Sequence, residues 1–191
     1  MRSGSGRRCS SGIGKCLSFS VTSTSLWVSA TAAIVTLLML WLHLAQLQLP
    51  LPHGDDQVSR LAFAARWLLL PGLALFAGIA VVAKLRFFVP DAMDGARDSQ
   101  SRLLEITLRY NQNTLEQTVL AAIAWAGLAL TLPHQMLTLI PAMAIVFIVG
   151  RLLFWIGYLI TPVARALGLG LSAYPTFAAL IWLAWRMFRP T

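Results

Sequence analysis

The chain has 191 residues, of which 58% are hydrophobic and 12% charged, and its mean hydropathy is +0.72. A soluble fold of this length could not bury so much apolar surface, so a bilayer must cover the rest and a soluble globular protein is excluded. The net charge of +8 does not indicate a nucleic-acid partner, because the fifteen Lys and Arg lie between apolar stretches instead of on one basic face.

The N-terminal 25 residues are rich in Ser, Thr, Gly and Arg and contain no acid, which is typical of a disordered tail. A transit-like segment or a start assigned too far upstream would give the same composition. Both cysteines, Cys9 and Cys16, fall in this tail, and the three histidines are scattered. The sequence therefore predicts neither a disulfide framework nor a metal site.

Residues 26–49 contain no charged side chain, and at about 1.5 Å per residue they exceed the roughly 30 Å thickness of the hydrocarbon layer. They predict an uncleaved spanning helix, because the stretch is too long for the apolar core of a signal peptide. Four further apolar stretches predict four more spans. These are residues 61–83, 103–132, 136–160 and 169–187.

Basic residues decide the predicted orientation, because cytoplasmic loops attract Lys and Arg. Nine of them lie in the tail, in the polar loop at 84–102 and in the link at 161–168. The opposite side has only Arg60, Arg186 and Arg189, with Arg66 just inside the membrane. We therefore expect a cytoplasmic N-terminus and a C-terminus on the outside.

The third span opens with three polar residues at helical spacing. Arg109, Asn113 and Glu116 fall at i, i+4 and i+7 and share one helix face. Charged groups are costly in lipid, so this face should look into the bundle or into a wet cavity. A ligand site and a structural Arg–Glu network that fixes helix packing remain equally open at this point.

The fourth span ends with a second polar face, which carries Arg151, Phe154 and Tyr158, and Arg165 follows in the link. The predicted topology brings these groups and the start of the third span to the cytoplasmic side. A pocket of several cations, a carboxamide, a carboxylate and a tyrosine suits a small, polar anion with more than one charge.

The order and spacing of these motifs resemble the MAPEG family, the membrane-associated proteins of eicosanoid and glutathione metabolism. The motifs are Arg-x-x-x-Asn-x-x-Glu at the head of one span, Arg-x-x-Phe-x-x-x-Tyr near the end of the next, and an Arg beyond it. The resemblance implies an all-α membrane protein with a MAPEG-type four-helix transmembrane bundle at 61–187. One extra transmembrane helix at 26–49 and the tail at 1–25 precede it.

The resemblance also implies a homotrimer in the lipid bilayer that binds glutathione as cosubstrate between subunits. Arg165 would lie at the thiol, because a guanidinium favours the nucleophilic thiolate. Two positions depart from the family pattern: Phe154 stands where some members have a Tyr, and Gln117 where some have an aromatic residue. The residues implied to hold the tripeptide are Arg109, Asn113, Glu116, Arg151 and Tyr158.

The sequence leaves alternatives for function. An enzyme would transfer glutathione to a hydrophobic small-molecule electrophile, or use it to reduce a lipid hydroperoxide. A non-catalytic member would bind or present a lipid with the same bundle. A small transporter is disfavoured, because its ionisable groups are expected near mid-membrane, whereas here they gather at one end.

Overall fold

The structure is a computed structural model that describes residues 49–88, 102–160 and 164–189, and eight helical positions between residues 30 and 41. The side chains at 158–160, 164 and 165 are not among the described ones. The predicted tail at 1–25, most of the predicted extra helix at 26–49 and most of the loop at 84–102 therefore lie outside the described residues.

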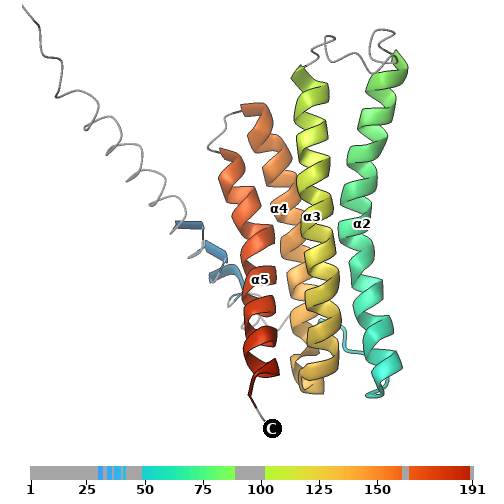
Figure 1. Cartoon of the computed structure of the whole chain (residues 1–191), viewed down its shortest axis with the longest axis vertical. Helices are drawn as coiled ribbons and strands as arrows, with labels where there is room; N and C mark the ends of the chain where they lie inside the picture. Colours follow the sequence, from blue (N-terminus) through green and yellow to red (C-terminus); the bar gives the residue numbers. More distant parts are fainter. Residues whose placement is uncertain are drawn as a thin grey trace, which may run out of the picture.

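Four long helices form the body of the described chain. They are α2 (Gln57–Phe88), α3 (Arg102–Thr131), α4 (Leu139–Ile160) and α5 (Ala164–Met187), with a short 3₁₀ helix, η2 (His134–Thr138), before α4. They run up and down beside one another as a bundle (Figure 1). All four bundle segments are long and apolar enough to cross a membrane, which confirms the predicted all-α membrane fold.

Several helix boundaries differ from the sequence prediction: α2 extends beyond both ends of 61–83 and runs on to Phe88, and α4 begins at Leu139 instead of residue 136 because η2 precedes it. Helix α2 begins at Gln57 because the carboxylate of Asp56 caps it, accepting the backbone N–H of Ser59 at 3.0 Å. Helix α5 begins at Ala164 instead of residue 169, so Arg165 lies in its first turn and not in a link. The sequence Ala-Arg-Ala-Leu after Pro162 favours this early start, since Pro is common at helix beginnings and these residues are strong helix formers.

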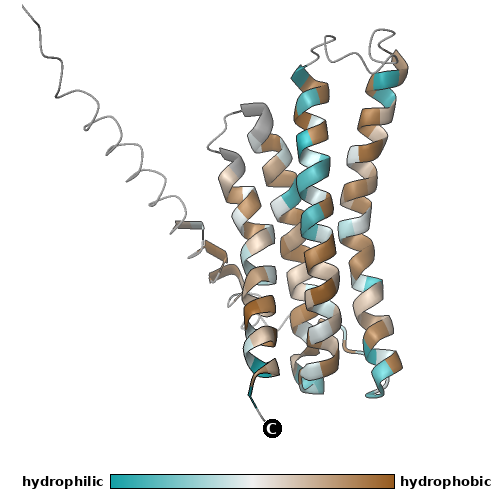
Figure 2. Cartoon of the chain, viewed as in Figure 1, coloured by the Kyte–Doolittle hydropathy of each residue, from teal (hydrophilic) through white to brown (hydrophobic). Residues whose placement is uncertain are grey.

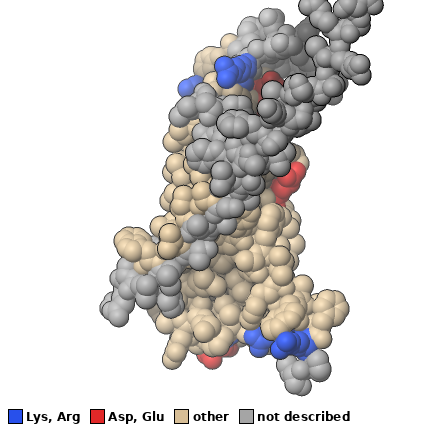
Figure 3. All heavy atoms as spheres, turned by 90° about the vertical axis from the view of Figure 1, so that its left-hand side faces the viewer, with Lys and Arg blue, Asp and Glu red and all other residues tan. Residues whose placement is uncertain are grey.

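The chain reversals create two ends of the bundle. The upper end of Figure 1 contains Phe88, Arg102, Ile160 and Ala164, and the lower end contains Gln57, Thr131, Leu139 and Met187. Charged side chains on the face shown in Figure 3 lie mostly toward these two ends. That distribution fits a bundle whose middle is surrounded by lipid.

The interior differs between the two halves. The lower half holds the apolar core, with Trp125, Leu137, Ile140 and Phe147 almost fully buried. The upper half of α3 is hydrophilic and its lower half hydrophobic (Figure 2).

The most extensive helix contacts are those between α4 and α5 and those between α2 and α3. At the α4–α5 crossing, a Cβ on Gly168 would overlap the backbone of Phe154, so only glycine permits this approach.

Candidate functional site

A buried arginine connects three helices in the upper half of the bundle. Arg151 of α4 is 1% exposed. Its guanidinium donates to the Asn113 Oδ1 atom of α3 at 2.7 Å and to the Ser172 Oγ atom of α5. The guanidinium carbon also lies 4.8 Å from the ring centroid of Phe154 and 5.4 Å from that of Phe147. The structure thus brings together two predicted site residues, Asn113 and Arg151.

The charge of Arg151 has no carboxylate counterpart among the described residues. Its polar partners, Asn113 and Ser172, are neutral, and its Nε atom is buried without a hydrogen-bond partner in the described part of the chain. A buried cation is costly unless paired, and such residues inside spanning helices commonly mark a functional site. The arrangement therefore leaves a buried positive charge without a described counter-charge.

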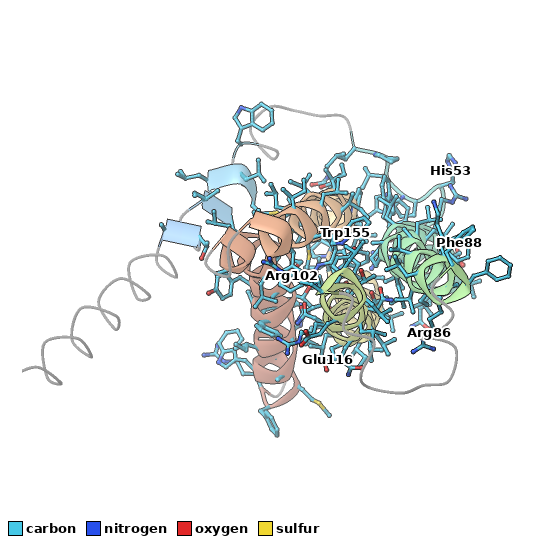
Figure 4. All side chains as sticks on the ribbon, turned by 90° about the horizontal axis from the view of Figure 1, so that it is seen from above. His53, Arg86, Phe88, Arg102, Glu116 and Trp155 are labelled. Atoms are coloured by element: carbon cyan, nitrogen blue, oxygen red, sulfur yellow. The ribbon has the colours of Figure 1, made fainter. Side chains whose placement is uncertain are left out.

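Two other predicted members, Arg109 and Glu116, do not reach Arg151 within one chain. Both are exposed on α3. The Arg109 guanidinium forms an ion pair with the Glu105 carboxylate at 2.6 Å, and the Gln112 amide donates to Glu116 at 2.8 Å. Seen along the bundle, Glu116 lies on the outer side of α3 (Figure 4). The predicted face exists, but only Asn113 of it turns inward.

The last two predicted residues lie where their side chains are not described. The backbone of Tyr158 is in the last turn of α4, and that of Arg165 is in the first turn of α5. Both positions are at the upper end, as the motif spacing predicts. Whether their side chains join Arg151 stays a prediction.

Two recesses flank the Arg151–Asn113 pair. One of about 270 Å³ is lined by Asn113, Gln117 and Tyr174, and Gln117 is 5% exposed with an Oε1 atom that has no described partner. The other, about 310 Å³, lies between α2, α3 and α4 and is almost wholly apolar apart from Tyr110 and Arg151. Trp155, which also lines the second recess, lies between α4 and α2 in Figure 4.

Sequence reasoning missed Ser172. It is 2% exposed, and besides Arg151 it contacts the carbonyl oxygens of Gly168 at 3.2 Å and Leu169 at 3.1 Å. The available signal was its place one turn after Gly168, since small residues mark close helix contacts where a short polar side chain can reach across. The Ser172 hydroxyl thereby reaches Arg151 of α4.

Comparison with known proteins gives two partial matches. The chain is 30% identical to mouse transmembrane protein 79 over 87 residues, which is 46% of this chain and 22% of that protein. It is 29% identical to the bovine protein of the same name over 87 residues, with the same coverage. The matched segment thus spans about a fifth of the length of these relatives. No solved structure matches the chain.

A family-level match is broader. The MAPEG family profile matches residues 24–186, which include 26–49 as well as nearly all of the described bundle. This confirms the family resemblance inferred from the Arg-x-x-x-Asn-x-x-Glu and Arg-x-x-Phe-x-x-x-Tyr motifs. With its multi-pass all-α bundle and a match that takes in most of its length, this chain belongs to the MAPEG family.

Proposed function

We propose that this protein binds glutathione in the upper half of its bundle and uses it on a hydrophobic acceptor. The observation that carries the proposal is the buried Arg151, which is held by neutral partners and has no carboxylate to balance it among the described residues. Glutathione has two carboxylates, and charge-assisted hydrogen bonds from a guanidinium to such groups are among the strong ones. Family membership supports the same ligand.

The exposed members of the motif support a site shared between copies. Arg109 and Glu116 point away from Arg151 in the single chain, so they would meet the ligand of a neighbouring copy. Asn113 and Arg151, with Tyr158, would hold the tripeptide from the inside. We therefore propose the homotrimer typical of the family, embedded in the bilayer with the N-terminus and the upper end facing the cytoplasm.

Arg165 is the proposed catalytic residue. Its guanidinium would stabilise the thiolate of glutathione, while the thiol proton leaves to solvent. In transfer, the sulfur electron pair forms a bond to the electrophilic carbon as the leaving group departs with its electrons. In reduction, two glutathione molecules and one hydroperoxide give a disulfide, an alcohol and water.

A second candidate function is non-catalytic binding of a lipid. The observation that favours it is the apolar recess of about 310 Å³ between α2, α3 and α4, which could accept part of a lipid chain. On this reading Arg151 would fix helix packing or hold a lipid carboxylate. The two functions differ in whether glutathione binds.

The deciding experiment measures glutathione binding and conjugation with the detergent-purified full chain. Asn113→Ala should weaken binding while the protein stays folded. The matched control is Asn111→Ala on the same helix, because Asn111 faces Gly78 of α2 and does not contact Arg151. No glutathione binding by the wild type would favour the lipid-binding function.

Thiolate formation tests the role of Arg165 separately. In the wild-type protein, the thiolate absorbance of bound glutathione should appear at pH values below roughly 8.5, which is the pKa of a free thiol. Arg165→Leu should raise the pKa of the bound thiol. Binding should fall less than the conjugation rate, because the inner polar groups remain. Identical titrations in both proteins would remove Arg165 from the mechanism.

A further inference from the structure

The lower end of the bundle carries four arginines, three of which have partners. Arg60 donates to the carbonyl oxygens of Ala129 at 3.2 Å and Leu132 at 2.8 Å and forms an ion pair with Asp55. Two more arginines each stack on a tryptophan: Arg186 lies over Trp182, and Arg189 lies over Trp185. For Arg66 of α2, the described residues offer no hydrogen bond, ion pair or ring contact.

Arg66 lines a recess of about 230 Å³. The recess lies between residues 50–53 and the first turns of α2, and Ser59, Phe63 and Trp67 also line it. The Trp67 Nε1 atom is buried without an acceptor in the described part of the chain. An exposed cation without a described partner therefore faces a recess that no carboxylate lines.

The depth of Arg66 places it at the lipid headgroups. Helix α2 has 32 residues, or about 48 Å at 1.5 Å each, so it extends about 9 Å beyond a 30 Å hydrocarbon layer at either end if centred. The Arg66 backbone then lies about 5 Å inside the layer, and its long side chain can reach the phosphates. Trp67 at the same depth matches the aromatic belt of membrane interfaces.

An apolar stripe continues from Arg66 toward the middle of the bilayer. Leu69, Leu73 and Phe76 follow it at helical spacing on the same face of α2, and they are 65%, 60% and 67% exposed. The face thus has a cation at its interfacial end and a hydrocarbon surface from there toward the middle of the bilayer. That order matches the head-to-tail order of a phospholipid.

We propose that the recess at Arg66 is a phospholipid site, in which the guanidinium binds the phosphate diester. The acyl chains lie along Leu69, Leu73 and Phe76. Close to the recess, the exposed carboxylate of Asp56 accepts the backbone N–H of Ser59, which is one of the lining residues. A headgroup that also carries an ammonium, as in phosphatidylethanolamine, is therefore the best match to the local charges.

Native mass spectrometry of the full chain during graded removal of phosphatidylethanolamine tests this site. Arg66→Leu should retain the lipid at least about tenfold more weakly than the wild type, because a charge-assisted contact is lost. Arg66→Lys should restore part of the retention. The matched control is Arg86→Leu, an exposed arginine at the upper end of the same helix, which should behave as the wild type.

Further arms identify the source of the effect. Diacylglycerol, which has the chains without the phosphate, should not be retained, and excess inorganic phosphate should not displace the phospholipid. Equal retention by Arg66→Leu and wild type, or equal loss in Arg86→Leu, would overturn the proposal. So would retention of diacylglycerol, or displacement by phosphate alone, which would assign the recess to a free anion.

Discussion

Each half of the bundle contains an arginine that is buried or largely buried, and the charges of the two arginines are compensated differently. Arg60, with a side chain 13% exposed, binds the Asp55 carboxylate and two carbonyl oxygens at the C-terminal end of α3. Arg151, 1% exposed, binds only the neutral Asn113 and Ser172. A carboxylate and the negative end of a helix dipole balance the first cation, whereas nothing described balances the second. The contrast is the reason why we propose a ligand-binding role for Arg151 and expect Arg60 to stabilise helix packing.

The largest expected effect concerns the helix crossing on which the upper site depends. Gly168→Leu should destabilise the protein by about 3 kcal/mol or more, because the new side chain meets the backbone of α4. Thermal unfolding in detergent measures this. Gly72→Leu is the control, since a Cβ at Gly72 meets nothing within 4 Å. Equal stability of the two variants would show that α4 and α5 can separate without cost.

The next effect separates binding from stability at Arg151. Arg151→Met should change the free energy of unfolding by less than about 1 kcal/mol, because removing an unbalanced buried charge offsets the lost hydrogen bonds. Glutathione affinity should fall about a hundredfold. Calorimetric titration and thermal unfolding give the two quantities. Strong destabilisation with unchanged affinity in the folded fraction would show that Arg151, like Arg60, stabilises helix packing.

Arg60→Met should give the opposite result. Loss of two carbonyl contacts at the end of α3 and of the Asp55 ion pair should destabilise the bundle by about 2–3 kcal/mol, with glutathione affinity unchanged. Arg66→Met on the same helix is the control and should lie within about 0.5 kcal/mol of the wild type. A loss of affinity in folded Arg60→Met would connect the two ends of α3.

A smaller effect tests the residue that orients Arg151. Ser172→Ala should weaken glutathione binding about fivefold to tenfold, as expected when one side-chain hydrogen bond to a guanidinium is lost. Thr176→Val is the control one turn further along α5, because the Thr176 hydroxyl donates only to the Ser172 backbone carbonyl. Equal affinities for both variants would mean that Asn113 alone positions the guanidinium.

The smallest effect is the pH dependence of the lower end. Hydrogen bonds from Arg60 and then His134 hold the pKa of the exposed Asp55 carboxyl below its ordinary 3.8. A lowered folded-state pKa gives stability that is present above 3.8 and is lost as the pH falls through the lower folded value. Asp55→Asn should remove this part of the acid dependence. Hydrogen bonds from Ser59 lower the pKa of the Asp56 carboxyl, and the acid dependence that comes from Asp56 should remain in the Asp55→Asn variant.

The sequence predicted the bundle well because four apolar stretches of spanning length allow few other folds. The approach of Asn113 to Arg151 also followed from motif order and helix periodicity. The directions of the Arg109 and Glu116 side chains did not follow in the same way, because each has a partner one turn away on α3. Glu105 pairs with Arg109, and Gln112 pairs with Glu116. Periodicity identifies a shared face but does not show which of its members a local pair will hold.

Other features depended on three-dimensional contacts that a pattern does not encode. Ser172 sits in an apolar helix, and its role appears only when the Gly168 crossing brings α5 against α4. The sequence prediction places Arg165 in a polar link, whereas the structure starts α5 before it, because the neighbours of Arg165 are strong helix formers. A charged residue near a helix start is therefore a weak indicator of a loop when strong helix formers flank it.

The polar half of α3 also has a consequence for how the protein is made. Helix α3 is the least hydropathic of the four spanning helices, and the Asn111 side chain on it packs where Gly78 leaves room on α2. A segment with several charged and amide side chains partitions poorly into lipid by itself. We therefore expect α3 to leave the translocation channel together with α2, as a helical hairpin whose pairing begins before the chain is complete.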